Sequence, residues 1–387
     1  TYRTLAPARR EMDSVSPGRY PKFAGIELVR SAQFPADWQG DAITLDFRAH
    51  RVVRFKFSDQ GSGYVTREMP DVMRTTTDSF RPIDVRLGPD GALYIADWSN
   101  PIIQHGEVDF RDTRRDKAHG RIWRVAAKDA AAPRPRVDLT RLANPALLDL
   151  LAAGDGFQQE QARRVLVERG LARVQADLDA WTGRQTAEPA RLAAYWMYQA
   201  FNHPNVPLLR ELLAARDPRV RAAAVRALPA GGDIGPLETL VADAHPRVRL
   251  EAVRALGSRR SARAAELALG ALERPMDPFL DYALWLTMND LAEPWLAAVK
   301  GGAWRLAGRE RQLEFGLRAV EPALASEVLG QLVGRQGVPR DGSGPWLDLI
   351  AAAGGPAELR FVLDQVRQGG FDDAAGPRAM RTLAEAG

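Results

Sequence analysis

Two segments of this chain repeat each other at a spacing of 28 residues, and no other pattern in it restricts the possible folds as much. Residues 216–228 read RDPRVRAAAVRAL and residues 244–256 read AHPRVRLEAVRAL, with Pro218 and Pro246 in matching places. Small and apolar residues recur in each copy at positions i, i+4, i+7 and i+8, which lie on one face of an α-helix. Proline is tolerated in the first turn of a helix, because no backbone donor is lost there. Both segments are therefore predicted to be amphipathic helices.

A second helical segment follows each copy, so the repeated unit is a pair of helices. These second helices are predicted at 236–244 and 261–272, and looser copies of the first helix begin at Glu188 and Asp277. Further helix pairs are expected at about 157–182, 309–334 and 344–369, with one unpaired helix at 372–386. A period of about 30 residues with two helices per unit predicts an α-solenoid. The DPxVRxxAVxAL pattern resembles HEAT repeats.

The repeated pattern also predicts which side chains are buried. Ala224 lies four residues after Val220 on the apolar face, and Ala252 has the same place in the next copy. Residues at such positions are small because neighbouring helices approach closely there. Arg221 and Arg226 are expected to point outward.

The first third of the chain has a different period. Apolar and polar residues alternate over 83–87, and residues 92–98 (ALYIADW) are rich in strand-forming types. The Gly-Pro-Asp-Gly sequence between them has the composition of a tight turn. Further strands are predicted at 23–31, 41–47, 50–57, 64–69 and 120–125. These strands amount to about two blades of a β-propeller, whereas closure needs at least about four, so an open sheet edge is expected.

Three stretches of this β region carry a family resemblance. RPIDVRLGPDGALYIADW (81–98), NPIIQHGE (100–107) and RRDKAHGRIWRV (114–125) resemble the end of the propeller in membrane-bound dehydrogenases, relatives of soluble glucose and sorbosone dehydrogenases. The resemblance implies an exported or periplasmic protein in which a propeller is followed by HEAT-like repeats and a haem-c domain with a CxxCH motif. It also implies a sugar or alcohol substrate, and a quinone cofactor or Ca²⁺ in the complete propeller.

The chain is predicted to have a mixed fold, β followed by α. Residues 1–127 are the C-terminal part of a β-propeller, 128–137 are a linker, and 138–387 are an α-solenoid of HEAT-like helix pairs. The linker reads KDAAAPRPRV, a composition that sustains neither a strand nor a core. The sequence begins without Met, so we expect a piece of a longer protein.

In the resembled family the pocket lies on a loop face of the propeller, and polar residues are concentrated in the corresponding loops here. The candidate catalytic residues are His105, His119, Asp97 and Asp116, and the candidate substrate- or cofactor-binding residues are Arg81, Arg121, Glu107 and Asp112. A histidine can take a hydroxyl proton while hydride leaves the adjacent carbon, with a carboxylate orienting the imidazole. Arginines can hold anionic groups bidentately. Alternatively, the carboxylates and histidines only tie down a long loop through hydrogen bonds to its backbone.

Composition excludes several classes of site. With no cysteine, the chain can form no disulfide, no CxxCH haem attachment and no thiolate metal site. Its five histidines lack zinc-ligand spacing, so neither a metal nor a cofactor is predicted in this chain. No apolar run is long enough for a membrane span. Of the 53 basic residues only five are lysine, and the arginines are interleaved with acidic residues, so nucleic-acid binding is not predicted.

Two functions remain open. The first is part of an exported, propeller-based sugar or alcohol dehydrogenase in which the solenoid serves as spacer or docking platform. The second is a non-enzymatic scaffold that binds a protein, or the rest of the parent chain, on the solenoid surface. Since the propeller section is short and no haem motif is present, the chain alone is predicted to be inactive as an enzyme.

Overall fold

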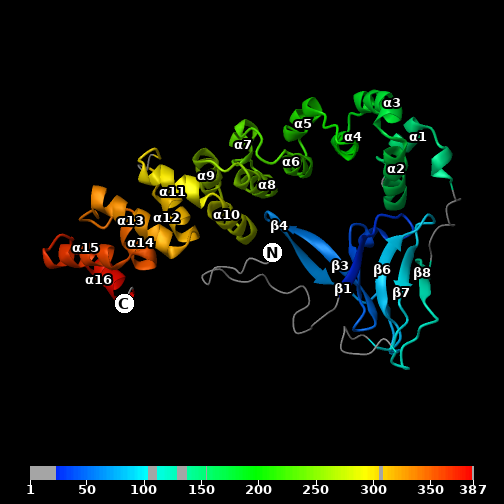
Figure 1. Cartoon of the computed structure of the whole chain (residues 1–387), viewed down its shortest axis with the longest axis horizontal. Coiled ribbons are helices and arrows are strands. Elements are labelled where there is room, and N and C mark those ends of the chain that lie inside the picture. The colour runs from blue at the N-terminus through cyan, green and yellow to red at the C-terminus, as the bar shows by residue number, and fades with distance from the viewer. Residues whose placement is uncertain (1–22, 103–110, 129–136, 154, 305–307, 386–387) are drawn as a thin grey trace. The chain divides into compact units, whose positions relative to one another are not determined.

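The protein is described by a computed structural model that covers residues 23–102, 111–128, 137–153, 155–304 and 308–385. Within these ranges the strands come first and the helices follow, as predicted (Figure 1). The strands are β1 (Phe23–Leu28), β2 (Ala42–Asp46), β3 (Arg51–Gln60), β4 (Gly63–Glu68), β5 (Met73–Arg74), β6 (Pro82–Leu87), β7 (Leu93–Asp97) and β8 (Arg121–Val125). Each predicted strand is present, and β5 is the one that the pattern missed.

The strands form two antiparallel sheets. One has the order β1-β2-β3-β4, with β5 also pairing with β3, and the other has the order β6-β7-β8. The predicted turn joins β6 to β7: Gly88 donates its N–H to the carbonyl of Ala92 at 2.8 Å, and Gly91 has a φ of +79°. This left-handed conformation suits a residue without a Cβ.

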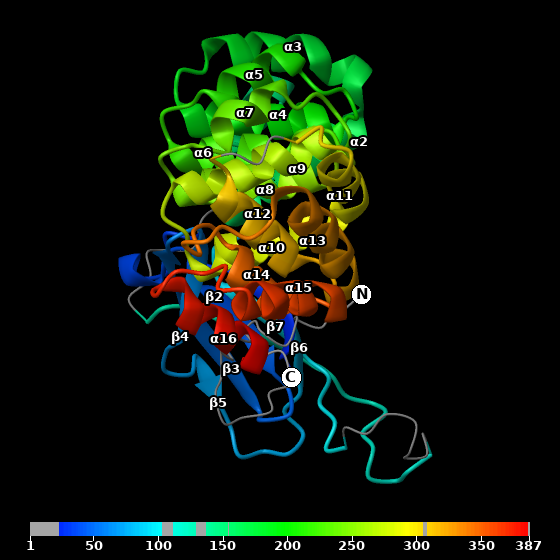
Figure 2. The ribbon, with the colours of Figure 1, turned by 90° about the vertical axis from the view of Figure 1, so that its left-hand side faces the viewer.

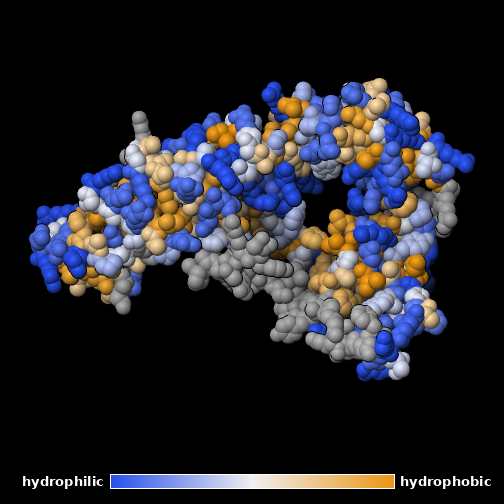
Figure 3. Space-filling view, in the orientation of Figure 1, coloured by the Kyte–Doolittle hydropathy of each residue, from blue (hydrophilic) through white to orange (hydrophobic). Residues whose placement is uncertain are grey.

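Residues of the two sheets and of the loops next to the strands share one hydrophobic core. Its buried members are Val29, Phe34, Ile43, Leu45, Val52, Phe80, Val85, Leu87, Leu93 and Ile95. Hydrophobic residues are also exposed over the strands, visible as orange in Figure 3, and Ile122 on β8 is 77% exposed. Among the described strands β8 pairs only with β7, so one of its edges faces no strand there. Two such sheets do not show a propeller, and the propeller assignment stays a prediction.

Sixteen α-helices follow in the described residues. They are α1 (Asn144–Leu150), α2 (Gly156–Arg169), α3 (Leu171–Arg184), α4 (Glu188–Ala200), α5 (Val206–Leu213), α6 (Pro218–Arg226), α7 (Gly235–Leu240), α8 (Pro246–Gly257), α9 (Ala262–Leu269), α10 (Pro278–Asp290), α11 (Ala292–Lys300), α12 (Glu310–Ala319), α13 (Pro322–Gln336), α14 (Trp346–Ala353), α15 (Pro356–Arg367) and α16 (Ala375–Glu385). Every predicted helix pair is found.

The first helices of the repeated pairs begin at the predicted prolines. Asp217 and His245 stand just before Pro218 and Pro246, and each accepts a hydrogen bond from the backbone N–H two residues later. Such N-caps satisfy donors that the first helical turn leaves free. Helix α6 is shorter than α8 in spite of the matching sequence, because Pro229 follows it closely and disfavours helical geometry in the residue before it.

The chain divides into two compact units. Unit 1 comprises Thr1–Gln60 and Tyr64–Leu208, and unit 2 comprises Gly61–Gly63 and Leu209–Gly387. Most of the predicted linker, residues 129–136, lies outside the described residues, so the boundaries drawn from the sequence stay a prediction.

Unit 1 joins the sheets to the first helices. The N–H of Gly156, at the start of α2, donates to the carbonyl of Arg30 at 2.7 Å. Phe157 packs against the hydrophobic core of the sheets. A Cβ at Gly156 would lie 3.1 Å from the Cβ of Arg30, so the absence of a side chain there allows this close approach.

Unit 2 is a helical repeat array with two layers. Helices α6, α8, α10, α12, α14 and α16 pack in succession in one layer, and α9, α11, α13 and α15 in the other. Figures 1 and 2 show these pairs following one another from green to red. Each repeat contacts its neighbours, as in a solenoid.

The structure confirms the buried face of the repeats but corrects one of the two predicted surface arginines. Ala224 and Ala252 are completely buried, and Arg226 is exposed. The side chain of Arg221 is only 17% exposed, since its Nε and Nη2 each donate to Asp243 at 2.9 Å. Position 221 thus faces the loop before the next repeat, a neighbour that helical periodicity does not reveal.

Arg221→Ala is expected to cost unit 2 about 2 kcal/mol, because hydrogen bonds to a charged group are among the stronger ones. Burial opposes ionisation of Asp243, but the hydrogen bonds from Arg221 and from the N–H of His245 outweigh it and lower the pKa of that carboxyl. The stabilisation is therefore complete above the unfolded pKa of about 4 and is lost as the pH falls through the folded value.

Urea denaturation of wild type and Arg221→Ala at pH 7 and pH 3 tests this expectation. The difference in free energy of unfolding between the two proteins should be smaller at pH 3 than at pH 7. Arg219→Ala is the control, because its side chain is 81% exposed and should contribute less than about 1 kcal/mol. An equal loss of unfolding free energy in both variants at pH 7 would contradict the stabilising role of the Arg221–Asp243 pair.

Candidate functional site

Asp97 lies at the end of β7 and is the centre of the predicted loop cluster. It is buried, and its Oδ1 accepts the N–H groups of Arg81 and Ser99, both at 2.8 Å. Its Oδ2 accepts from Trp123 Nε1 at 3.0 Å and Arg121 Nη1 at 3.4 Å. Ser99 has a φ of +54°, a strained conformation that Asp97 helps to hold. Four donors thus converge on one carboxylate.

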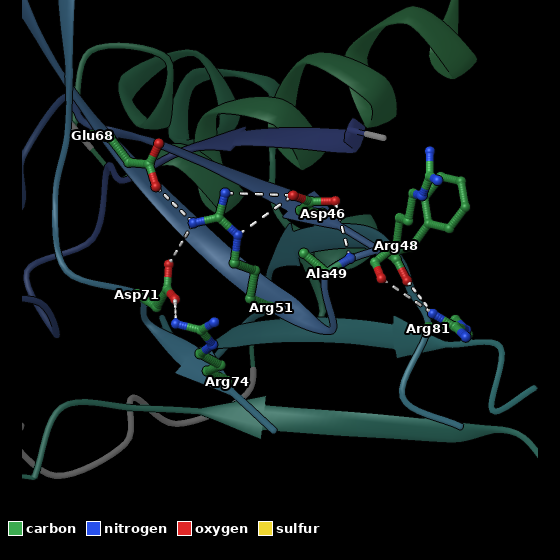
Figure 4. Close-up of polar contacts among 9 residues, drawn as sticks. Asp46, Arg48, Ala49, Arg51, Glu68, Asp71, Arg74 and Arg81 are labelled. Atoms are coloured by element: carbon green, nitrogen blue, oxygen red, sulfur yellow. Dashed lines mark hydrogen bonds and ion pairs between the residues drawn. The ribbon is translucent and has the colours of Figure 1, made fainter. Parts of the chain in front are cut away.

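The guanidinium of Arg81 is bonded mainly to the main chain. Its Nε donates to the carbonyl of Asn100 at 2.9 Å, Nη2 to that of Pro101 at 3.1 Å, and Nη1 to that of Phe47 at 2.9 Å. Figure 4 shows this arginine reaching the turn that precedes β3. The ring of His50 lies 3.2 Å from Nη1 through its Nδ1. Arg81 therefore joins the two sheets, and its guanidinium has few N–H donors left for an anionic ligand.

Asp116 and His119 form a separate pair. Both carboxylate oxygens lie 3.1 Å from Nδ1 of the imidazole, and Oδ1 also accepts the N–H groups of Ala118 and His119. Those backbone hydrogen bonds lower the pKa of Asp116. The His119 side chain is 75% exposed. The pair has the contact needed to orient an imidazole, but it lies on an open turn.

The other candidate residues are dispersed or lie outside the described residues. Asp112 pairs with Arg114, whose side chain lowers the pKa of that carboxyl to about 2. His105 and Glu107 fall within residues 103–110, outside the described ranges. The structure thus brings Arg81, Asp97 and Arg121 together. The Nδ2 of Asn100, a residue that sequence reasoning missed, donates to the carbonyl of Asp116 at 3.4 Å.

A second polar cluster in the first sheet was not predicted. Arg51 is buried and contacts Glu68 at 2.6 Å, Asp71 at 3.1 Å and Asp46 at 3.4 Å (Figure 4). Burial lowers the pKa of Arg51, but the three carboxylates outweigh this and raise it. The alternation of apolar and polar residues in β3 predicts that Arg51 lies in a strand, but it does not show which carboxylates Arg51 contacts. The cluster ties β2, β3, β4 and the chain just after β4 together.

No metal site is found in the described ranges, where no three or more acidic or histidine side chains are placed to hold an ion. A cavity of about 480 Å³ in unit 1 is lined by Ser31, Ala32, Phe34, Ala36, Gln39, Ala153 and Asp155. Several of its polar groups serve the fold: Ser31 Oγ donates to the carbonyl of Gly91, Gln39 Nε2 donates to three carbonyls, and Asp155 caps α2. It offers little to a ligand.

A groove of about 280 Å³ in unit 2 has a different lining. We call it the arginine groove; its residues are Val225, Arg226, Leu228, Ala230, Glu251, Arg254, Ala255, Ser258 and Arg259. It lies between the C-terminal ends of α6 and α8. Arg226 and Arg254 have matching places in the two repeats, and their side chains are 66% and 57% exposed. Consecutive repeats therefore bring two guanidinium groups to one site.

Glu251 lies between these two arginines. Its Oε2 is 3.2 Å from Arg254 Nη1 and 3.8 Å from Arg226 Nε. Burial raises the pKa of Glu251, although Arg226, Arg254 and Arg247 act to lower it. One buried carboxylate thus faces two half-exposed cations, and the groove keeps an excess of positive charge.

Comparison with known families identifies two parts of the chain. The model for HEAT repeats matches residues 206–289, which run from α5 to α10. These helices are HEAT-like repeats. A domain of unknown function (DUF7133) matches residues 2–129. No curated protein matches the chain.

The HEAT-like resemblance is thus confirmed over the repeats that define the groove. Neither matched description names a dehydrogenase, so that resemblance remains a prediction. No helix in the described part of the chain is long and apolar enough to cross a membrane.

Proposed function

We propose that the HEAT-like array of unit 2 is a protein-binding scaffold. The arginine groove carries this proposal, because it is a side-chain-sized cavity between two repeats with half-exposed charged walls. Arginine is enriched in protein interfaces, where it combines apolar contact with hydrogen bonding. The partner is a separate protein or another part of a longer parent chain.

A site-specific crosslinking experiment tests the scaffold. A photo-crosslinking amino acid replaces Ala230, which lines the groove, or Ala214, an exposed alanine of unit 2 outside it. The full chain is incubated with an extract of the source cells, and crosslinked proteins are identified by mass spectrometry. A defined protein captured reproducibly through position 230 and not 214 is the expected result. No capture above background at either position would overturn the scaffold.

The second candidate is part of an exported, propeller-based sugar or alcohol dehydrogenase, with the array as spacer. The contact between Asp116 and His119 favours it, since a carboxylate-oriented imidazole is a suitable general base. The pair lines neither of the two cavities described above.

Two cofactors implied by that candidate, haem c and Ca²⁺, lack suitable ligands among the residues in question. Covalent haem c needs cysteines, and the chain has none. Ca²⁺ needs several converging oxygen ligands, and the described residues hold no such group. We therefore place covalent haem c outside this chain and propose no Ca²⁺ site among the residues that the structure describes.

Dye reduction with sugars and alcohols, with and without added quinone, tests the second candidate. We expect this chain to stay at background. Turnover that disappears in His119→Ala would favour the dehydrogenase and make the exposed pair part of its site.

A further inference from the structure

The arginine groove lies in a basic part of the protein. Residues 216–263 contain ten arginines and five acidic residues, an excess of five positive charges, whereas the whole chain carries +4. Three of these ten arginines are neutralised within the fold: Arg221 binds Asp243, Arg219 binds Asp217, and Arg263 binds Glu238 and Glu266.

Pairing is incomplete in the groove itself. Arg226 and Arg254 share the single carboxylate of Glu251, and both side chains remain more than half exposed. Two cations facing one anion attract a further negative group, and partial desolvation strengthens that attraction relative to open surface. The positive charge also suits the C-terminal ends of α6 and α8, so a test must separate binding from helix stability.

Arg259 belongs to the same lining. Its Nη1 donates to the carbonyl of Ala255 at 2.6 Å and to Ser258 Oγ at 2.7 Å. Its Nε and Nη2 are buried and meet no hydrogen-bond acceptor within the residues that the structure describes. Because both nitrogens are buried, Arg259 contributes positive charge to the lining and not an exposed edge for a ligand.

The groove also has an apolar component. Val225, Leu228, Ala230 and Ala255 contribute to its lining beside the charged groups. Its volume of about 280 Å³ is at the lower limit of small-molecule pockets and suits one or two side chains. The buried carboxylate of Glu251 between the two arginines disfavours a continuous phosphate backbone.

We propose that the arginine groove binds an acidic polypeptide segment, with a carboxylate side chain between Arg226 and Arg254 and an adjacent apolar side chain against Val225 and Leu228. This proposal rests on the scaffold function and names the chemistry of its partner. The incoming carboxylate supplies the second negative charge that Glu251 alone does not provide.

The test uses the full chain and a fluorescent peptide of alternating glutamate and leucine, with binding followed by fluorescence anisotropy. A glutamine–leucine peptide of equal length and a single-stranded oligonucleotide serve as comparison ligands. We expect the glutamate peptide to bind at least about tenfold more tightly than the glutamine peptide, a difference of about 1.4 kcal/mol. The oligonucleotide should not compete at equal concentration.

Variants locate the binding. Arg226→Gln combined with Arg254→Gln should weaken glutamate-peptide binding at least about tenfold, with helical circular dichroism unchanged because both side chains are exposed. The matched control combines Arg164→Gln and Arg318→Gln, which removes the same charge from side chains 69% and 49% exposed, each paired with a glutamate. That control should bind like wild type. Glu251→Gln should strengthen binding severalfold.

Four outcomes would overturn the proposal: equal binding of both peptides, no detectable binding of the glutamate peptide, equal losses in the groove and control variants, or displacement by the oligonucleotide. The scaffold is judged separately by crosslinking. A partner captured equally by wild type and the groove variant would keep the scaffold and reject the groove as its acidic-segment site.

Discussion

Replacing Ala224 with Arg is expected to destabilise unit 2 by about 3 kcal/mol or more. Ala224 is completely buried on α6, which packs directly against α8. A longer side chain must either overpack this contact or bury an unpaired charge, and the second is the more costly. Because each repeat depends on its neighbours, the damage should spread along the array and broaden the unfolding transition.

Chemical denaturation followed by circular dichroism measures this loss. Arg226→Ala is the control from the same helix, and with an exposed side chain it should change stability by less than about 0.5 kcal/mol. If Ala224→Arg were as harmless as the control, α6 would have to pack through another face.

Asp97→Ala is expected to cost unit 1 about 3 kcal/mol or more. The change leaves the buried N–H groups of Arg81 and Ser99 without their acceptor, and it removes the partner of Trp123 and Arg121. Each buried donor left unsatisfied costs about 1–3 kcal/mol.

Trp123 reports on this variant directly, since its indole donates to Asp97, so its fluorescence should shift in the folded state as well as on unfolding. Asp116→Ala is the matched control in the neighbouring loop and should have a much smaller effect, because that carboxylate lies on an open turn. A stable Asp97→Ala protein would leave the catalytic interpretation of this residue as the better one.

The Asp97 and Asp116 variants distinguish a structural role of a loop carboxylate from a catalytic one. A carboxylate in a loop next to histidines has the composition of a catalytic site, and this is why Asp97 and Asp116 were candidates. In the structure the donors around Asp97 are mainly backbone or orienting groups of the fold. The hydrogen bonds that Arg81 donates to main-chain carbonyls are consistent with that structural role. The catalytic assignments remain predictions that turnover alone can test.

Local pattern was sufficient for most of the secondary structure. Apolar residues recur with a period of two in strands and of about 3.6 in helices. The buried face of each element can therefore be read from residues close together in the sequence. The prolines at 218 and 246 with their N-caps mark the helix starts, and Ala224 and Ala252 mark the inward face. The signals themselves are local in sequence, and their recurrence after 28 residues identifies the repeat.

The polar sites depended on tertiary structure, because their partners are distant in the chain. Arg221 and Arg226 are the same residue type in the same helix. Arg221 nevertheless pairs with Asp243 in the loop before the next repeat, whereas Arg226 remains mostly exposed beside Glu251. Glu251 lies in α8, and the apolar periodicity of that helix does not predict that a glutamate is buried there. Helical and strand periods specify which side of an element is apolar, but not which charged group from another element will face it. That pairing, and with it the arginine groove, is decided only when the repeats pack.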